Sequence, residues 1–131
     1  MVLKDLLEGF DSTFITTDQG LITANSILKS NIILDCNRDT PLRLIRSIAG
    51  AGYVVVRSRP HVIISTGALP GLLCLAFGRL LGARTIWLDS IANAEKLSMC
   101  GVVAQYLSHH CITQWEHLTQ LPRVKYYGSV L

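Results

Sequence analysis

Charged residues, paired cysteines and long apolar runs are all scarce in this sequence. Only 16% of its 131 residues are charged while 50% are hydrophobic, a composition that excludes a disordered chain. The longest uncharged stretch, within 60–83, is broken by Pro70 and Arg79, which argues against a membrane span. The length fits one domain, so we expect residues 1–131 to form a single folded unit.

The cysteines also lack the spacing of a metal site or a disulfide framework. The chain contains Cys36, Cys74, Cys100 and Cys111, and none forms a C-x-x-C pair. Such usage is typical of a reducing compartment. The first ten residues include three charged ones and do not resemble a signal peptide. We therefore expect a cytoplasmic protein, free or peripheral to a membrane, with no metal site.

Acidic residues are missing from the middle of the chain. Between Asp39 and Asp89 the sequence has no acid but carries six arginines: Arg43, Arg46, Arg57, Arg59, Arg79 and Arg84. Such asymmetry indicates an anionic partner, either a membrane surface or phosphate groups. The plain alternative is that these arginines are scattered, solvated side chains, because closeness in sequence does not establish closeness in space.

Strand and helix patterns alternate along the chain. Runs of β-branched and apolar residues predict strands at 12–17, 31–34, 61–65, 84–88, 111–113 and 125–127. Helices are predicted over 4–10, from 39–41 to just before Pro60, and over 70–81, 99–107 and 115–121. The alternation predicts an α/β fold with a mostly parallel sheet.

Two of these elements have distinctive patterns. The continuous apolar run 61–65 is typical of a parallel strand that is buried on both faces. The helix that follows Pro41 is amphipathic, and its apolar side comprises Leu42, Ile45, Ile48, Ala49 and Tyr53.

Polar segments follow three of the predicted strands, at 65–67, 89–90 and 114–116. Ligands of parallel sheets bind beyond the carboxyl ends of the strands, so we expect these segments to share one functional edge. Gly67 starts a helix whose free N–H groups suit an anion, although a plain strand-to-helix turn is an alternative. Asp89 is suited either to bind sugar hydroxyls or act as a base, or to cap the next turn.

The sequence offers no complete catalytic set. His109 and His110 adjoin a strand start away from this edge and are interpreted as structural. No Ser/His/Asp arrangement and no metal spacing is recognisable, so no catalytic residue is predicted.

An ordered set of motifs carries a family resemblance over residues 12–131, strongest over 59–131. The set comprises S-T-G after a strand, a helix ending in L-L-G-A, the Asp89–Ser90 pair, Q-W-E and a final Y-Y-G. In this order the chain resembles the acceptor-side, membrane-associating subunit of the split UDP-N-acetylglucosaminyltransferase of lipid-linked oligosaccharide synthesis. It equally resembles bacterial polysaccharide biosynthesis proteins of the PssD and CpsF type, and more distantly the amino-terminal domain of MurG.

The resemblance implies a Rossmann-like, GT-B amino-terminal half-domain that is inactive without a catalytic, UDP-sugar-binding subunit. It implies no cofactor and no nucleic-acid partner. The acceptor, a lipid-pyrophosphate-linked sugar, would contact Ser65, Thr66, Gly67, Asp89, Ser90 and Asn93. Near the partner interface it implies Trp115, Glu116 and Gly128. Membrane headgroups or the acceptor's pyrophosphate would meet Arg43, Arg46, Arg57 and Arg59.

The chain departs from this family at its start. Relatives begin with a strand and a glycine- and histidine-rich loop, and neither is present here. The first strand is central in such a sheet, and its loss would leave unpaired backbone on two buried strands. We therefore expect that the chain is a fragment or has a misassigned start, that the neighbouring strands close up directly, or that another chain fills the gap. Two other functions stay open on the residues alone: a stand-alone Rossmann-type nucleotide or small-molecule binding module, and a scaffold that recruits an enzyme to the membrane.

Overall fold

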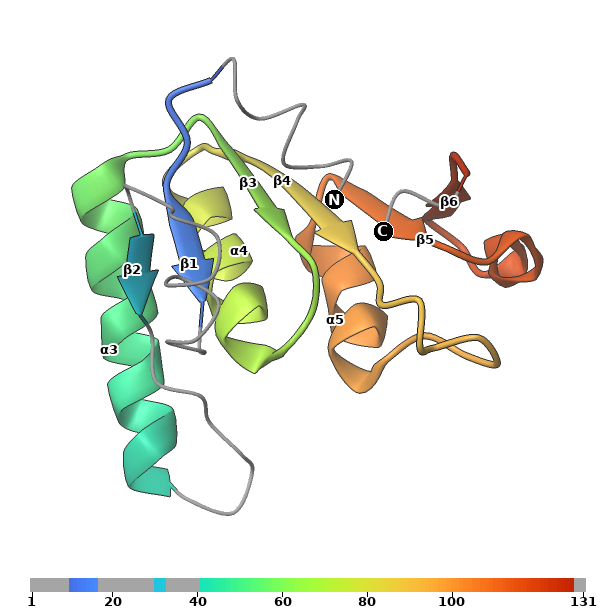
Figure 1. Cartoon of the computed structure of the whole chain (residues 1–131), viewed down its shortest axis with the longest axis horizontal. Helices are drawn as coiled ribbons and strands as arrows, with labels where there is room; N and C mark the ends of the chain where they lie inside the picture. Colours follow the sequence, from blue (N-terminus) through green and yellow to red (C-terminus); the bar gives the residue numbers. More distant parts are fainter. Residues whose placement is uncertain (1–9, 17–29, 33–40, 129–131) are drawn as a thin grey trace.

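The computed structural model describes residues 10–16, 30–32 and 41–128, and within them strands and helices alternate (Figure 1). The elements are β1 (Phe14–Thr16), β2 (Ser30–Ile32), α3 (Pro41–Ser58), β3 (Val62–Ser65), α4 (Leu69–Leu80), β4 (Arg84–Leu88), α5 (Met99–Leu107), β5 (His110–Thr113), the 3-10 helix η1 (Glu116–Gln120) and β6 (Val124–Tyr126). This order confirms the predicted α/β class. The helix predicted over 4–10 and the last two residues of the strand predicted over 31–34 lie outside the described residues.

Four parallel strands form the main sheet in the order β3-β4-β5-β6. The register pairs Ser65 with Trp87, Leu88 with Ile112, and Thr113 with Tyr126. The carboxyl ends of all four strands therefore lie along one edge of the sheet, as expected for the three polar segments that follow them.

The strands β1 and β2 form a separate parallel pair, in which Phe14 lies opposite Ser30 and Thr16 opposite Ile32. Among the described strands, β3 is hydrogen-bonded only to β4, so β1 and β3 do not close up into one sheet. The interruption expected from the missing strand is thus present as two sheets, and the alternative in which its neighbours pair directly is wrong.

The core lies between the main sheet and helices α4 and α5, which cover the same face of it (Figure 1). Trp87 is fully buried at its centre and shares this core with Leu75, Ala104 and Cys111. Burying about 200 Å² of an indole side chain is worth about 5 kcal/mol. At Gly78 a Cβ atom would collide with the side chain of Ile63, so this glycine lets α4 pack directly on β3.

The opposite face of β3 is less covered than its sequence predicts. Val62 is 50% exposed and Ile64 36% exposed, whereas Ile63 packs against the core. Successive strand side chains point to opposite faces, and α4 and α5 cover only the face of Ile63. The prediction that residues 61–65 are buried on both faces is therefore wrong.

Helix α3 packs against α4 through a narrow strip of small side chains. Its buried residues are Ser47, Ala51 and Val55, while the aromatic ring of Phe77 on α4 lies against Gly52. Its larger apolar side chains point away from the protein interior. No helix within the described ranges is long and apolar enough to cross a membrane.

Candidate functional site

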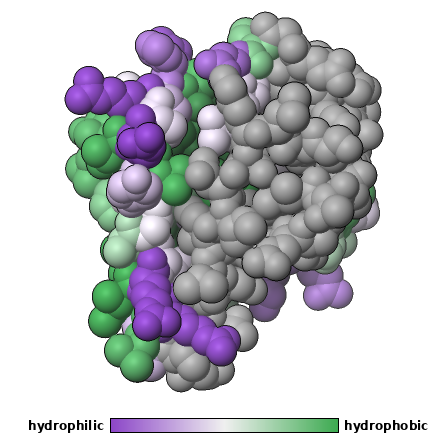
Figure 2. Space-filling model, turned by 60° about the vertical axis from the view of Figure 1, so that its left-hand side comes forward, coloured by the Kyte–Doolittle hydropathy of each residue, from purple (hydrophilic) through white to green (hydrophobic). Residues whose placement is uncertain are grey.

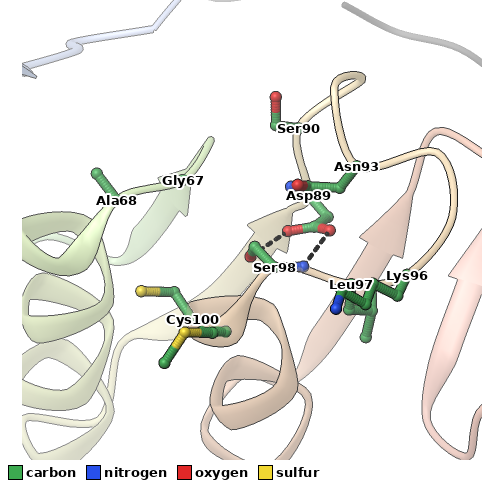
Figure 3. Close-up of a pocket in the computed structure, with 10 residues that line it drawn as sticks. Gly67, Ala68, Asp89, Ser90, Asn93, Lys96, Leu97, Ser98 and Cys100 are labelled. Carbon is green, nitrogen blue, oxygen red and sulfur yellow. Dashed lines mark hydrogen bonds between the residues drawn. The ribbon is translucent and has the colours of Figure 1, made fainter.

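A hollow of about 550 Å³ lies at the carboxyl edge of the main sheet, between the first turns of α4 and α5 and the loop that follows β4 (Figure 3). It is lined by Gly67, Ala68, Asp89, Ser90, Asn93, Lys96, Leu97, Ser98, Met99 and Cys100. The hollow therefore brings together residues from two of the three predicted segments.

The turn from β3 into α4 forms one wall and has an unusual backbone. Gly67 has φ 133° and Ala68 has φ 62°, a region that residues with a Cβ rarely adopt. Such a conformation costs about 1–3 kcal/mol and is concentrated at ligand-binding turns. No side chain caps the start of α4 at Ala68, so the first backbone N–H groups of this helix donate to no capping side chain.

Asp89 forms the floor of the hollow and is almost completely buried. One carboxylate oxygen, Oδ1, accepts hydrogen bonds from Trp87 Nε1 at 3.2 Å and from Ser98 Oγ at 2.7 Å. The other, Oδ2, accepts one from the backbone N–H of Ser98 at 3.1 Å. Both oxygens are thus engaged with the protein itself, and Figure 3 shows the carboxylate directed at Ser98. Asp89 holds the start of α5 in place.

Ser98 continues this network into α5. Its hydroxyl donates to Asp89 and accepts from the backbone N–H of Gly101 at 2.8 Å, which caps the helix. A Cβ atom at Gly101 would approach Asp89 Oδ1 to 2.8 Å, so the close packing requires glycine there. Burial, together with the negative charge of Asp89, raises the pKa of the Cys111 thiol to about 12.

The loop after β4 is anchored on both sides. Within it, Ser90 accepts hydrogen bonds through its hydroxyl from the Ala92 N–H at 3.3 Å and through its carbonyl from the Asn93 N–H at 3.0 Å. From the next segment, Trp115 Nε1 donates to the carbonyl of Ile91 at 2.9 Å. These contacts preorganise the loop, so that a ligand in the hollow would meet a wall that is already in place.

The structure separates the six predicted acceptor residues into two groups. Gly67, Asp89, Ser90 and Asn93 line the hollow. Ser65 is buried beneath the turn, where its Oγ lies 3.5 Å from the carbonyl of Gly67, and Thr66 is exposed outside the lining.

The three predicted interface residues follow β5 and β6 rather than lining the hollow. Trp115 and Glu116 follow β5 along the same sheet edge, and the Trp115 indole donates a hydrogen bond to Ile91 in the loop after β4. Gly128 follows β6 and has φ 94°. Their roles at an interface stay predictions.

The predicted phosphate- or membrane-contacting arginines lie outside the hollow. Arg43, Arg46 and Arg57 belong to α3, and Arg59 follows its last turn. Arg57 borders a second, smaller hollow of about 250 Å³ beside Tyr53 and Thr13. The arginines therefore belong to a different surface from the lining of the acceptor hollow.

Sequence reasoning did not select Lys96 or the start of α5. Lys96 is exposed and supplies the ammonium group in the lining of the hollow. The sequence signal that could have indicated these residues was the polar loop between β4 and α5, because a loop of this length can fold back over the strand ends. His109 serves a structural purpose as predicted, since its Nδ1 lies 3.1 Å from the Thr85 N–H and 2.9 Å from the Thr85 hydroxyl. Within the described ranges no His, Cys, Asp and Glu side chains cluster as metal ligands would.

Comparison with solved structures defines the class of fold. A crystal structure of MurG from Acinetobacter baumannii superposes on 99% of this chain with a TM-score of 0.75, at 10% sequence identity, and the match covers 40% of that protein. The chain thus has the α/β fold of a GT-B half-domain, as predicted.

Comparison of sequences identifies the family. The family described as "Oligosaccharide biosynthesis protein Alg14 like" matches residues 11–130, so the chain belongs to the Alg14-like family. The UDP-N-acetylglucosamine transferase subunit ALG14 of Candida albicans is 33% identical in an alignment 94 residues long, which covers 66% of this chain and 43% of that protein. The subunit of the same name from Yarrowia lipolytica is 33% identical over 92 residues, 65% of this chain and 43% of that protein. The chain therefore matches less than half the length of these relatives.

Proposed function

We propose that this chain is the acceptor-side, non-catalytic subunit of a two-component glycosyltransferase. It binds a lipid-pyrophosphate-linked sugar, docks at the cytoplasmic face of a membrane and recruits a catalytic subunit that holds the UDP-sugar. The fungal relatives are named as subunits of a UDP-N-acetylglucosamine transferase, which supports both a partner and this donor. The observation that carries the proposal is the hollow in which Gly67, Asp89, Ser90 and Asn93 meet.

The chemistry of the hollow suits a phosphorylated sugar. The Asn93 amide and Ser90 hydroxyl offer hydrogen bonds to sugar hydroxyls, and Lys96 offers a positive charge. The N-terminus of α4 faces the same space without a side-chain cap, and helix N-termini favour anions such as pyrophosphate. The N-terminus of α5 is already held by Asp89 and Ser98.

The state of Asp89 supports a structural role and not a catalytic one. A general base must reach the proton that it removes, yet both Asp89 oxygens already accept hydrogen bonds within the protein. The base and the nucleotide site are therefore assigned to the partner subunit. Trp115 and Glu116 lie on the same sheet edge, so the proposed partner interface would be next to the acceptor.

The test is a transfer assay in detergent with a UDP-sugar, a lipid-pyrophosphate-linked sugar and the partner subunit. Asn93→Ala and Lys96→Ala should each raise the KM for the acceptor up to about tenfold, the effect of one lost hydrogen bond. The kcat should stay within about threefold, because the chemistry belongs to the partner. Lys125→Ala, at an exposed lysine on β6, is the matched control.

Two results would contradict the proposal. The first is turnover of a UDP-sugar by the purified chain alone, which would make it a catalyst. The second is tight binding of UDP or NAD without a partner, which would favour a stand-alone Rossmann-type binding module.

A further inference from the structure

Helix α3 carries a largely exposed apolar surface, with Thr13 beside Tyr53 at a small hollow near its last turns. Leu42 is 75% exposed, Ile45 62%, Tyr53 66% and Val56 55%. The steps between these positions and Ala49 are three or four residues, so all of them lie on one side of a helix with about 3.6 residues per turn. Helices of soluble proteins normally turn such a side toward the core. Here the buried side is instead the small strip of Ser47, Ala51 and Val55.

Positive charge flanks this apolar surface. Arg46 lies three residues after Arg43 and eleven before Arg57, about three turns, so the three guanidinium groups share one flank of α3. All three are exposed, and α3 contains no acidic residue. Figure 2, which turns the left-hand side of Figure 1 forward, shows hydrophobic and hydrophilic side chains next to each other among the described residues. An apolar strip with a cationic border fits an anionic lipid surface.

The topology places the first turn of α3 at the same end of the molecule as the acceptor hollow. Helix α3 leads directly into β3 and runs back along the sheet, so its first turn lies at the edge where the strands end (Figure 1). Leu42 and Ile45, in the first two turns, therefore lie at the same end of the molecule as Gly67 and Asn93. A lipid-linked substrate has its headgroup at the bilayer surface, and the first turn of α3 would meet that surface at the end of the molecule where the hollow lies.

We propose that α3 is the membrane-docking element of this protein and lies in the plane of an anionic bilayer surface. Leu42, Ile45, Tyr53 and Val56 enter the interface, while Arg43, Arg46 and Arg57 contact lipid phosphates. This inference rests on the proposed function and names the element, its orientation and the lipid chemistry that it recognises.

The experiment is flotation of the full chain with vesicles of phosphatidylcholine, with and without an equal amount of phosphatidylserine. The wild-type chain should bind the mixed vesicles and lose binding in 0.5 M salt, because ions at about that concentration screen charges within a few ångströms. Arg43→Ala with Arg46→Ala should weaken binding about 25-fold, since each cation near an anionic leaflet contributes about a factor of five. Leu42→Asn with Ile45→Asn should weaken it at least about tenfold.

Matched controls use exposed residues outside α3. Leu80→Asn changes an 83% exposed leucine in the last turn of α4, and Arg84→Ala changes an exposed arginine at the start of β4. Both should bind the mixed vesicles within about twofold of the wild type. Circular dichroism melting establishes that every variant is folded, which the high exposure of the changed residues favours.

Three outcomes would overturn the inference. They are unchanged binding of the Leu42 and Ile45 variant, no vesicle binding by the wild type, and a wild-type dimer that this variant converts to a monomer. The detergent transfer assay separates the inference from the proposed function. If that assay fails while vesicle binding follows the α3 variants, the inference stands and the transferase role falls.

Discussion

Helices α3 and α4 lie side by side, yet they place their large apolar side chains in opposite directions. Helix α4 turns Leu72, Cys74 and Leu75 into the core, and only its last turn exposes a leucine that is 83% accessible. Helix α3 buries three small residues and leaves Leu42 and Ile45 in solvent. The difference teaches that α4 supports the fold, whereas α3 contributes little to the core and has its apolar side available for an interface.

The comparison is tested most strongly by deleting a core side chain. Leu75 is fully buried among the residues around Trp87, so Leu75→Ala should lower the free energy of unfolding by about 3 kcal/mol, through lost transfer energy and a cavity. Urea unfolding followed by circular dichroism measures the change. An effect below about 1 kcal/mol would show that α4 is not the structural helix of the pair.

A second test concerns the buried carboxylate that joins β4 to α5. Asp89→Asn keeps the shape but replaces one acceptor oxygen with an amide N–H group, which then faces the Ser98 donors or the Trp87 N–H. We expect a loss of about 2 kcal/mol in unfolding free energy, because buried hydrogen bonds to a charged group are lost. A fully stable Asp89→Asn variant with impaired acceptor binding would instead assign Asp89 to the ligand.

The pH dependence of the free energy of unfolding tests whether the buried side of α4 is shielded from water. Burial raises the pKa of the Cys74 thiol to about 11, from 9.0 for an unperturbed thiol. Above pH 9 the unfolded chain loses this proton and the folded chain keeps it, so stability is complete below pH 9 and falls until about pH 11. The slope per thiol is at most about 1.4 kcal/mol per pH unit. Cys74→Ala should flatten the fall, and an identical curve for this variant would contradict the assigned burial.

The smallest effect is expected on the outer side of α3. Ile45→Asn replaces a side chain that is 62% exposed, so the free energy of unfolding should change by no more than about 0.5 kcal/mol. The same urea titration used for Leu75→Ala gives the direct comparison. A loss of 2 kcal/mol or more would mean that the apolar side of α3 is covered in the folded protein.

Much of the fold was predictable because local patterns agree with their final environment. The strand at 84–88 and the helix at 99–107 have the predicted bounds, and the 3-10 helix at Glu116–Gln120 falls within a segment predicted as a short helix. Strand β6 begins one residue earlier than predicted, a shift within the ordinary uncertainty of element ends. For the candidate site, the strand-end rule selected Gly67, Asp89 and Ser90 and the family resemblance added Asn93, and the structure brings these four together.

The failures of sequence reasoning concern which face is covered. The apolar run at 61–65 does not reveal that α4 and α5 pack on a single face of β3 and leave Val62 half exposed. Lys96 gave no signal of its own, because its place at the hollow depends on how the loop after β4 folds back. Ser65 matches the family motif but lies beneath the turn, since its strand position points it toward α4 and Gly71.

By itself, the sequence determined the alternation of strands and helices and the parallel sheet, because hydrophobic period and turn residues are local properties. It also predicted the sheet edge at which the hollow lies. Only the tertiary structure decided that the Asp89 carboxylate accepts hydrogen bonds from Ser98 and Trp87, and that the apolar side of α3 faces outward. Both features depend on which surfaces meet in space. Helix α3 packs on α4 through the side that carries Ala51 and Val55, and no local sequence pattern specifies which of its two sides is buried.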